Sequence, residues 1–523
     1  MVQASKSATQ RMQEILDQLS PAQQDVLTRW LADHQRVLAE NHLLREELRL
    51  LRIDKYGPRS EKLSDEQLDL LEAEPSVLAA EVEQEARRAE EEALRPRVKR
   101  QTQHPGREEL PAHLERREVR IPCPPQDCVC PVCQGEKVII GYERSEELDV
   151  IPAQYFVRVT LREKRACPRH PEGGVVSAPC PPKVVPKSKL SNAMIVDVLV
   201  KKYGDHLPAY RQSQSLERDA EIDLSRKTLI GVILKAGDLL EALLPTLKAD
   251  LFGGGYIQAD ETRVPCQSPE VVGRHHQAYL WEFSRPQGPV IFDFQMSRGR
   301  ASPSKFLEGY AGILQTDGYA AYDKLGEGIA YGACWAHVRR EFYRAHQLAQ
   351  EDPRPLEILG WIGQLYQLEE QARAGGLSHP QRQGMRAEQS RPLVERLGER
   401  IMAIRSEPDV LPAGQLGKAC QYAFGQWSRL QLFLDHGQME IDNNLCENAI
   451  RPLAVGRKNW LHIGSEEAGP RVAAIASIFE TCRRLDINVR DYLLDILPRL
   501  PEWPMHRVAE LSPMAWKSRQ PAS

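Results

Sequence analysis

The chain has 523 residues, of which 41% are hydrophobic and 27% are charged, and its formal net charge is −4. This length predicts several domains, each able to bury a core of its own. No apolar run approaches the roughly 20 residues that a membrane-spanning helix needs, and the opening residues lack the apolar core of a signal peptide. We therefore expect a cytoplasmic protein with no membrane partner. The eleven cysteines are odd in number and unevenly spaced, which favours a reducing compartment and some metal-bound thiolates.

The charge distribution is more informative than the net charge. Residues 61–94 carry a net charge of −9, whereas residues 95–122, 183–235 and 451–484 carry +4, +4 and +3. Separate basic segments in a mildly acidic chain favour a modular DNA-binding protein. The alternative for each single basic segment is a solvent-exposed surface that binds no DNA.

Residues 25–58 are predicted to form a coiled coil that pairs copies of the chain. One seam position recurs every seven residues, at Trp30, Val37, Leu44 and Leu51. Asn41 occupies the other seam position, where a lone Asn favours a parallel coiled coil of two helices. The alternative is one amphipathic helix packed on its own domain. Residues 59–118 are interpreted as a charged linker.

Residues 119–182 are dense in Cys and Pro and are predicted to form a small β-rich module, with strands at 138–140 and 155–161. A CxxC pair and a later CxxH pair can supply four tetrahedral zinc ligands: Cys130, Cys133, Cys167 and His170. Such a site is structural, because no coordination position remains for water. Cys128 and Cys180 are possible substitutes, and the alternative is a loop of free cysteines.

Residues 183–250 are predicted to form helices that bind DNA. Ser225 is the expected N-cap of the last of them, and Arg226 and Lys227 open that helix. A turn followed by a helix with basic first residues is how a helix-turn-helix motif meets the major groove. Three consecutive amphipathic helices are common in proteins, so they are weak evidence for DNA binding by themselves.

Residues 251–464 change to the pattern of a mixed α/β core. Five short apolar runs predict strands, starting near residues 256, 278, 290, 312 and 329. Residues 341–438 are expected to be a helical insertion in this core, and residues 465–523 a helical C-terminal region.

Three acids lie in contexts that suit catalysis. Asp260 and Asp317 are expected at the ends of the first and fourth strands, and Glu447 on a polar helix face. Three carboxylates suit Mg²⁺, and two such ions can clamp the attacking and leaving oxygens of a phosphoryl transfer. Mn²⁺ could substitute. The alternative is that each acid is a cap or a surface charge, and Asp442 competes with Glu447 as third acid.

Four runs together resemble a known family: GGGYIQADET, LQTDGYAAY, CWAHVRR and DNNLCENAIRPLAVGRKNWL. They look like the DDE transposases of the insertion sequence sixty-six family, and the resemblance extends roughly from Leu31 to Leu500. It implies an RNase H-like core with the metal-holding acids at Asp260, Asp317 and Glu447. His170 replaces the Cys that this family usually has as its last zinc-type ligand, but His is an equally good ligand.

Several basic residues are predicted to contact DNA phosphates beside these acids. Besides Arg226 and Lys227 they are Arg339, Arg340, Arg451, Arg457 and Lys458. An alternative for Arg451 is an ion pair with Glu447. Cys334 and His337 share one helical turn and could form a second metal site, but packing beside the active site is the favoured interpretation.

The sequence thus predicts a multidomain α+β transposase: coiled coil, zinc module, DNA-binding helices and an RNase H-like core with a helical insertion. It would bind the ends of an insertion sequence as a homodimer or higher oligomer, cleave DNA and transfer the strands to target DNA. Accessory proteins of the same element are further candidate partners. The alternatives are a structure-selective nuclease on the same core, and a non-catalytic DNA-binding dimer.

Overall fold

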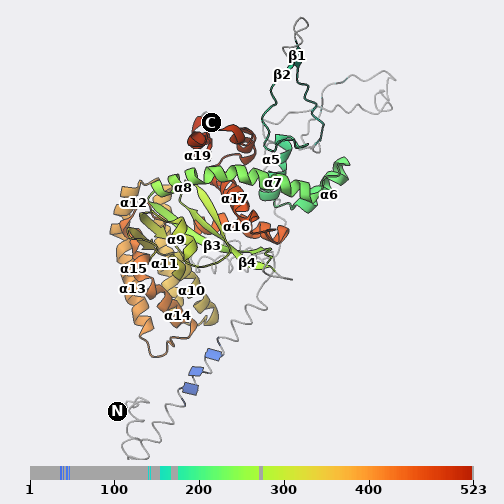
Figure 1. Cartoon of the computed structure of the whole chain (residues 1–523). Helices are drawn as coiled ribbons and strands as arrows, with labels where there is room; N and C mark the ends of the chain where they lie inside the picture. Colours follow the sequence, from blue (N-terminus) through green and yellow to red (C-terminus); the bar gives the residue numbers. More distant parts are fainter. Residues whose placement is uncertain are drawn as a thin grey trace, which may run out of the picture. The chain divides into compact units, whose positions relative to one another are not determined.

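The computed structural model describes residues 154–166, 175–269 and 275–520, with single residues between 34 and 46 and at 139 and 142 (Figure 1). The chain divides into two compact units, residues 1–82 with 178–523, and residues 83–177. The predicted linker and zinc ligands, and most of the predicted coiled coil, lie outside the described residues.

In the smaller unit, β1 (Lys164–Ala166) pairs with β2 (Val175–Ser177) in an antiparallel hairpin. The strand predicted at 155–161 is wrong, because residues 154–163 have no strand structure. Its apolar side chains are exposed, Phe156 by 79% and Leu161 by 91%. A strand forms where a partner accepts its hydrogen bonds, and alternation of side chains alone does not provide one.

The helices expected before the sheet are α5 (Asn192–Tyr203), α6 (Ala209–Ala220), α7 (Arg226–Leu240) and α8 (Leu244–Gly253), with a short 3₁₀ turn, η3 (Glu241–Leu243), before α8. Ser191 caps α5, and Ser225 caps α7 by accepting a hydrogen bond from the Thr228 amide at 3.2 Å. The N-cap predicted at Ser225 is therefore confirmed.

One five-stranded sheet forms the centre of the larger unit, in the order β5-β4-β3-β6-β7. Its strands are β3 (Tyr256–Cys266), β4 (His276–Ser284), β5 (Val290–Gln295), β6 (Gly312–Gln315) and β7 (Ile329–Gly332). β4 pairs antiparallel with both β3 and β5, whereas β6 pairs parallel with β3, and β7 pairs parallel with β6. The predicted mixed α/β sheet is confirmed. The placement of Asp260 at a strand end is wrong, because β3 continues six residues beyond it to Cys266 and pairs with β4 throughout.

The two faces of the sheet pack against different helices. Ile257, Trp281 and Phe283 face a core shared with α5, α7 and α8. The opposite face carries Val264 and Phe292 under α16 (Asn444–Trp460), and Tyr256 against the insertion. Because side chains alternate along a strand, Asp260 lies on the α16 face.

The edge strand β5 is covered by α17 (Ala468–Arg484) (Figure 1). The amide of Val290 donates to the Thr481 hydroxyl at 3.0 Å, and the amide of Phe292 donates to the Ser477 hydroxyl at 2.8 Å. These helix side chains satisfy backbone groups that an edge strand otherwise leaves open.

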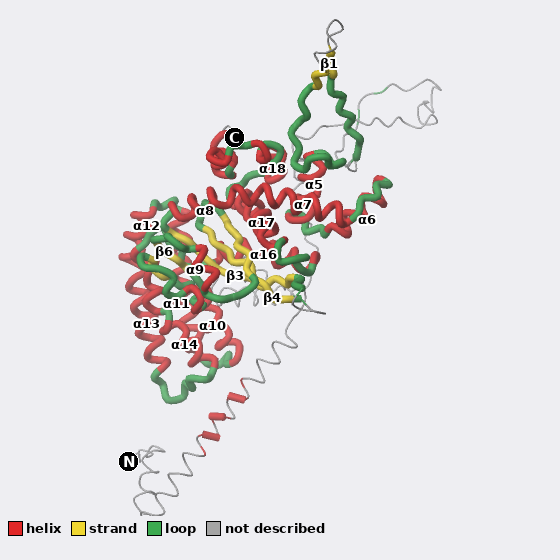
Figure 2. The backbone as a smooth tube through the Cα atoms, viewed as in Figure 1, coloured by secondary structure: helices red, strands yellow, loops and turns green. Residues whose placement is uncertain are grey.

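The insertion after β7 is a bundle of helices (Figure 2). It contains α10 (Trp335–Leu348), α11 (Pro353–Ala374), α12 (His379–Met385), the π-helical η5 (Arg386–Ser390), α13 (Arg391–Arg405), α14 (Gln415–Gly425), α15 (Trp427–Gln431) and the 3₁₀ turn η6 (Leu432–Asp435). Fully buried side chains such as Trp335, Phe342 and Leu397 form its core.

A buried ion network lies inside this bundle. Arg386 is fully buried and donates to both carboxylate oxygens of Glu369 at 2.7 Å. Arg386 also donates to the carbonyls of Phe433, His436 and Met439. Its charge and its donors are thus satisfied without water.

The remaining elements are short or C-terminal. They are α9 (Ala301–Phe306), η4 (Ala320–Tyr322), α18 (Val489–Ile496), η7 (Leu500–Glu502), η8 (Met505–Leu511) and α19 (Pro513–Arg519). Within the described ranges, no helix has the length and hydropathy that crossing a bilayer requires.

Candidate active site

The three predicted acids come from three different elements of the core. Asp260 lies within β3, Asp317 follows β6 by two residues, and Glu447 lies in the first turn of α16. β3 and β6 are adjacent and parallel, with Gln258 and Gln315 as register partners, so the acids two residues further on emerge side by side. α16 then packs over β3 and brings Glu447 to the same face.

The charges of these acids act on one another. Burial raises the pKa of Asp260 well above its usual range, and the negative charges of Asp317, Glu261 and Glu447 raise it further. This behaviour is typical of carboxylates that lie close to one another.

Glu447 is held from the side of α10. Its carboxylate lies 3.7 Å from Nε2 of His337 and 3.6 Å from Nη2 of Arg340, and its side chain is 25% exposed. Burial and the Arg340 charge lower the pKa of His337, against the attraction of Glu447. The neutral imidazole is therefore favoured, and Arg340 supplies the positive charge near Glu447.

The donors present suit a hard cation. Oε1 of Glu447 is buried and has no hydrogen-bond partner among the described residues, so it has an open acceptor position there. Carboxylate oxygens are the ligands that Mg²⁺ and Mn²⁺ prefer. Within the described part of the chain, however, no three Asp, Glu, His or Cys side chains stand close enough together to form a metal-binding group. The chemistry of the acids therefore fits a hard cation, although their side chains do not form one cluster of ligands.

Asp442, the competing third acid, makes hydrogen bonds at the start of α16. Its Oδ1 accepts from the amide of Asn444 at 3.0 Å and its Oδ2 accepts from the Asn444 side chain at 2.9 Å, at the start of α16. Burial raises the pKa of Asp442 to about 6. Its carboxylate thus caps the helix that carries Glu447.

Sequence reasoning missed a fourth carboxyl group. Glu282 is fully buried on β4, is the register partner of Asp260, and accepts a hydrogen bond from the Cys446 thiol. Burial raises its pKa to about 7. A charged residue inside the apolar run AYLWEFS was the available signal, but its partner lies 164 residues away.

The predicted DNA-contacting residues have different surroundings. Arg226, Lys227, Arg451 and Lys458 are exposed, and Arg340 is half-exposed. Arg457 donates to the carbonyl of Arg263 and so links α16 to β3. Arg339 is partly buried, and its charge acts on Tyr366.

Cys334 is buried, and its sulfur accepts from the amide of Asn443 at 3.3 Å. This contact supports packing rather than a second metal site with His337. Of the cysteines considered for zinc, only Cys180 lies among the described residues, where it is exposed and free.

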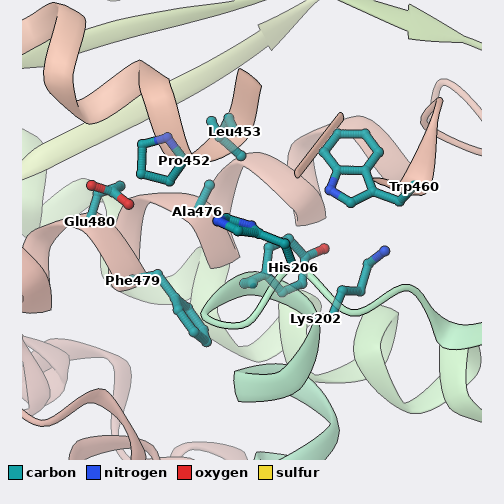
Figure 3. A pocket seen from close by; sticks show the side chains of 9 residues that line it. Lys202, His206, Pro452, Leu453, Trp460, Ala476, Phe479 and Glu480 are labelled. Atoms are coloured by element: carbon teal, nitrogen blue, oxygen red, sulfur yellow. The ribbon is translucent and has the colours of Figure 1, made fainter. Parts of the chain in front are cut away.

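A pocket lies further along α16, between that helix, α5 and α17 (Figure 3). Lys202 lies 5.5 Å from the ring of Trp460 there, and burial lowers its pKa to about 8. Pro452 leaves the carbonyl of Asn448 without its helical donor, and Arg483 supplies one at 3.3 Å. The residues that line this pocket do not include Asp260, Asp317 or Glu447.

Comparisons with known proteins agree on one family. The model of the family described as "Transposase IS66 family" matches residues 187–471, more than half of the chain. Two further models match: "Transposase C of IS166 homeodomain" at residues 43–119, and "zinc-finger binding domain of transposase IS66" at residues 127–169.

Curated relatives occur in Sinorhizobium fredii. The uncharacterized protein y4qI is 33% identical over 430 residues, which cover 79% of this chain and 77% of the relative. The uncharacterized protein y4jD is 31% identical over 431 residues, which cover 79% of this chain and 82% of the relative. With matches over the core and over both N-terminal segments, the chain belongs to the IS66 family of transposases.

Proposed function

We propose that this transposase cleaves DNA at the ends of an insertion sequence and joins the freed 3′ ends to target DNA. The observation that carries the proposal is the convergence of Asp260, Asp317 and Glu447 on one face of the sheet. The sheet, with one acid in its first strand, one just after its fourth strand and a third on a covering helix, supports an RNase H-like core.

The acids would hold two Mg²⁺ ions, which supply an activated water and stabilise the charge that develops on the phosphate. The surrounding residues orient the site. Arg340 and His337 restrain the Glu447 side chain, and Arg451 and Lys458 lie exposed on the same helix, available to DNA phosphates.

The N-terminal segments would have separate tasks. Cys130, Cys133, Cys167 and His170 would hold a structural zinc ion, a proposal that the zinc-finger match at residues 127–169 supports for the three cysteines. The N-terminal helix would pair copies of the chain, because Val37 and Leu44, seven residues apart, are 46% and 57% exposed. DNA ends would then be bound by α7 through Arg226 and Lys227.

The test is an assay that contains Mg²⁺ and a pair of DNA ends with the inverted repeats that flank the gene. It measures DNA cleavage and strand transfer. Asp260→Asn and Asp317→Asn should abolish both steps and retain end binding, because groove and phosphate contacts lie on other elements. Asp323→Asn, at an acid that pairs with Arg429 at 2.7 Å outside the site, is the matched control and should remain active. Cleavage without strand transfer would favour the nuclease, and end binding without cleavage in the wild type would favour the non-catalytic dimer.

A further inference from the structure

A glutamine precedes each of the acids Asp260 and Asp317 by the same number of residues. Gln258 and Gln315 each lie two residues before an acid, in the runs IQAD and LQTD, and both are fully buried. They are register partners on β3 and β6, and Nε2 of Gln258 donates to Oε1 of Gln315 at 3.0 Å. Because strand side chains alternate, both amides lie on the face that carries the acids.

Both amides reach the backbone just ahead of α16. Gln258 donates to the carbonyl of Asp442 at 2.7 Å, and Gln315 donates to the carbonyl of Glu440 at 2.9 Å. Tyr256 completes the contact, since its hydroxyl donates to Gln315 at 2.5 Å and accepts from the amide of Glu440 at 3.1 Å.

This segment leads directly into the helix that carries the third acid. Asn443 is the N-cap residue of α16, and its side chain donates to the carbonyl of Ala259 at 3.1 Å, beside Asp260. Glu447 follows in the first turn. The start of α16 is therefore fixed to both strands that carry the other acids.

The insertion holds the same segment from its other side. Arg382 donates to both carboxylate oxygens of Glu440, at 2.8 and 2.7 Å. Arg382 also pairs with Glu369, the centre of the buried ion network. Residues 440–443 are thus held between the sheet and the insertion.

We propose that Tyr256, Gln258 and Gln315 are positioning residues that set Glu447 against Asp260 and Asp317. The inference rests on the proposed function of the three acids. Apolar side chains of the same size would fill this space, but they would leave the carbonyls of Glu440 and Asp442 without these donors. The polar groups fix where the segment lies, and hence where Glu447 lies. Residues that orient metal ligands in this way typically change metal affinity by about 10–100-fold when removed.

The test is Mn²⁺ binding by the full-length protein, followed by the electron paramagnetic resonance signal of the free ion. Tyr256→Phe removes the hydroxyl and keeps the ring, and it should raise the Kd for Mn²⁺ by about tenfold or more. Tyr492→Phe is the matched control, because that buried hydroxyl, on α18, also contacts a carbonyl, of Leu511 at 2.7 Å. It should lose comparable stability and keep the wild-type Kd.

Gln258→Met is a second variant with the same expected direction. Kd values within about twofold of wild type for Tyr256→Phe and Gln258→Met, or an equal rise in Tyr492→Phe, would overturn the positioning role. If Gln258→Met does not fold, Tyr256→Phe decides alone. Failure of the proposed function gives a different result: wild type and Asp260→Asn would then bind Mn²⁺ equally.

Discussion

Glu282 and Asp260 are register partners on β4 and β3, so two carboxyl groups lie next to each other on the face beneath α16. Only Asp260 belongs to the proposed metal site. Glu282 is fully buried and accepts from the thiol of Cys446, the residue before Glu447. It therefore links the start of α16 to β4.

The raised pKa of Glu282 predicts a pH-dependent stability. An acid whose pKa rises from the ordinary 4.5 to about 7 on folding stabilises the fold at low pH, and this contribution is lost as the pH rises from about 4.5 to about 7. Glu282→Gln should remove this dependence and make the protein more stable than wild type at pH 8, by on the order of 3 kcal/mol. Urea unfolding at pH 5 and pH 8 measures it, and a wild-type advantage at pH 8 would contradict the prediction.

The third acid is tested by comparing Glu447 with Asp442. Glu447→Gln should lower DNA cleavage on the order of a hundredfold or more, because it removes a metal ligand. Asp442→Asn keeps a capping oxygen for the amide of Asn444 and should cleave at a rate near that of the wild type. The opposite pattern in a cleavage assay would assign the role to Asp442.

The zinc site is tested by metal analysis. Purified protein should contain about one zinc ion per chain, and Cys130→Ser combined with Cys133→Ser should lose it, because two of four ligands are removed. Cys180→Ser, at an exposed free thiol, should retain it. Zinc retained in the double variant would refute the ligand set.

The N-terminal seam is tested by sedimentation. Val37→Glu combined with Leu44→Glu places charges on the predicted seam and should dissociate the dimer. Arg36→Gln, at an exposed position off the seam, should sediment as the wild type does. An unchanged mass of the seam variant would show that the chain associates elsewhere.

The buried ion network predicts a large loss on removal of one partner. Arg386→Met leaves Glu369 buried with fewer donors and should lower the free energy of unfolding by about 3–5 kcal/mol. Arg391→Met breaks an exposed pair with Asp435 and should cost about 1 kcal/mol or less. Equal losses in chemical denaturation would mean that burial of the network does not matter.

Local patterns in the sequence predict the five strands of the central sheet and the helix that begins after Ser225, because apolar runs and capping residues act within a few positions. They failed at residues 155–161, where an alternating run has no strand partner. They also place Asp260 at a strand end, where the apolar run stops, whereas pairing with β4 extends β3 to Cys266.

The contacts around the acids required the fold. Gln258 and Gln315 look like ordinary polar residues in the sequence, and their carbonyl partners lie 184 and 125 residues away. Such pairs depend on tertiary structure, which one sequence does not reveal. Asp260 and Asp317 could be proposed because each charge follows an apolar run, and Glu447 because it lies on a polar helix face.

The cover of β5 by α17 has a consequence for how copies of this protein meet. An open edge strand lets a neighbouring chain add its own strand and extend the sheet, in ordered assemblies or in aggregates. Here the hydroxyls of Ser477 and Thr481 accept the hydrogen bonds of the backbone amides of Phe292 and Val290. Along these residues, a second molecule could add a strand to β5 only after α17 had been displaced.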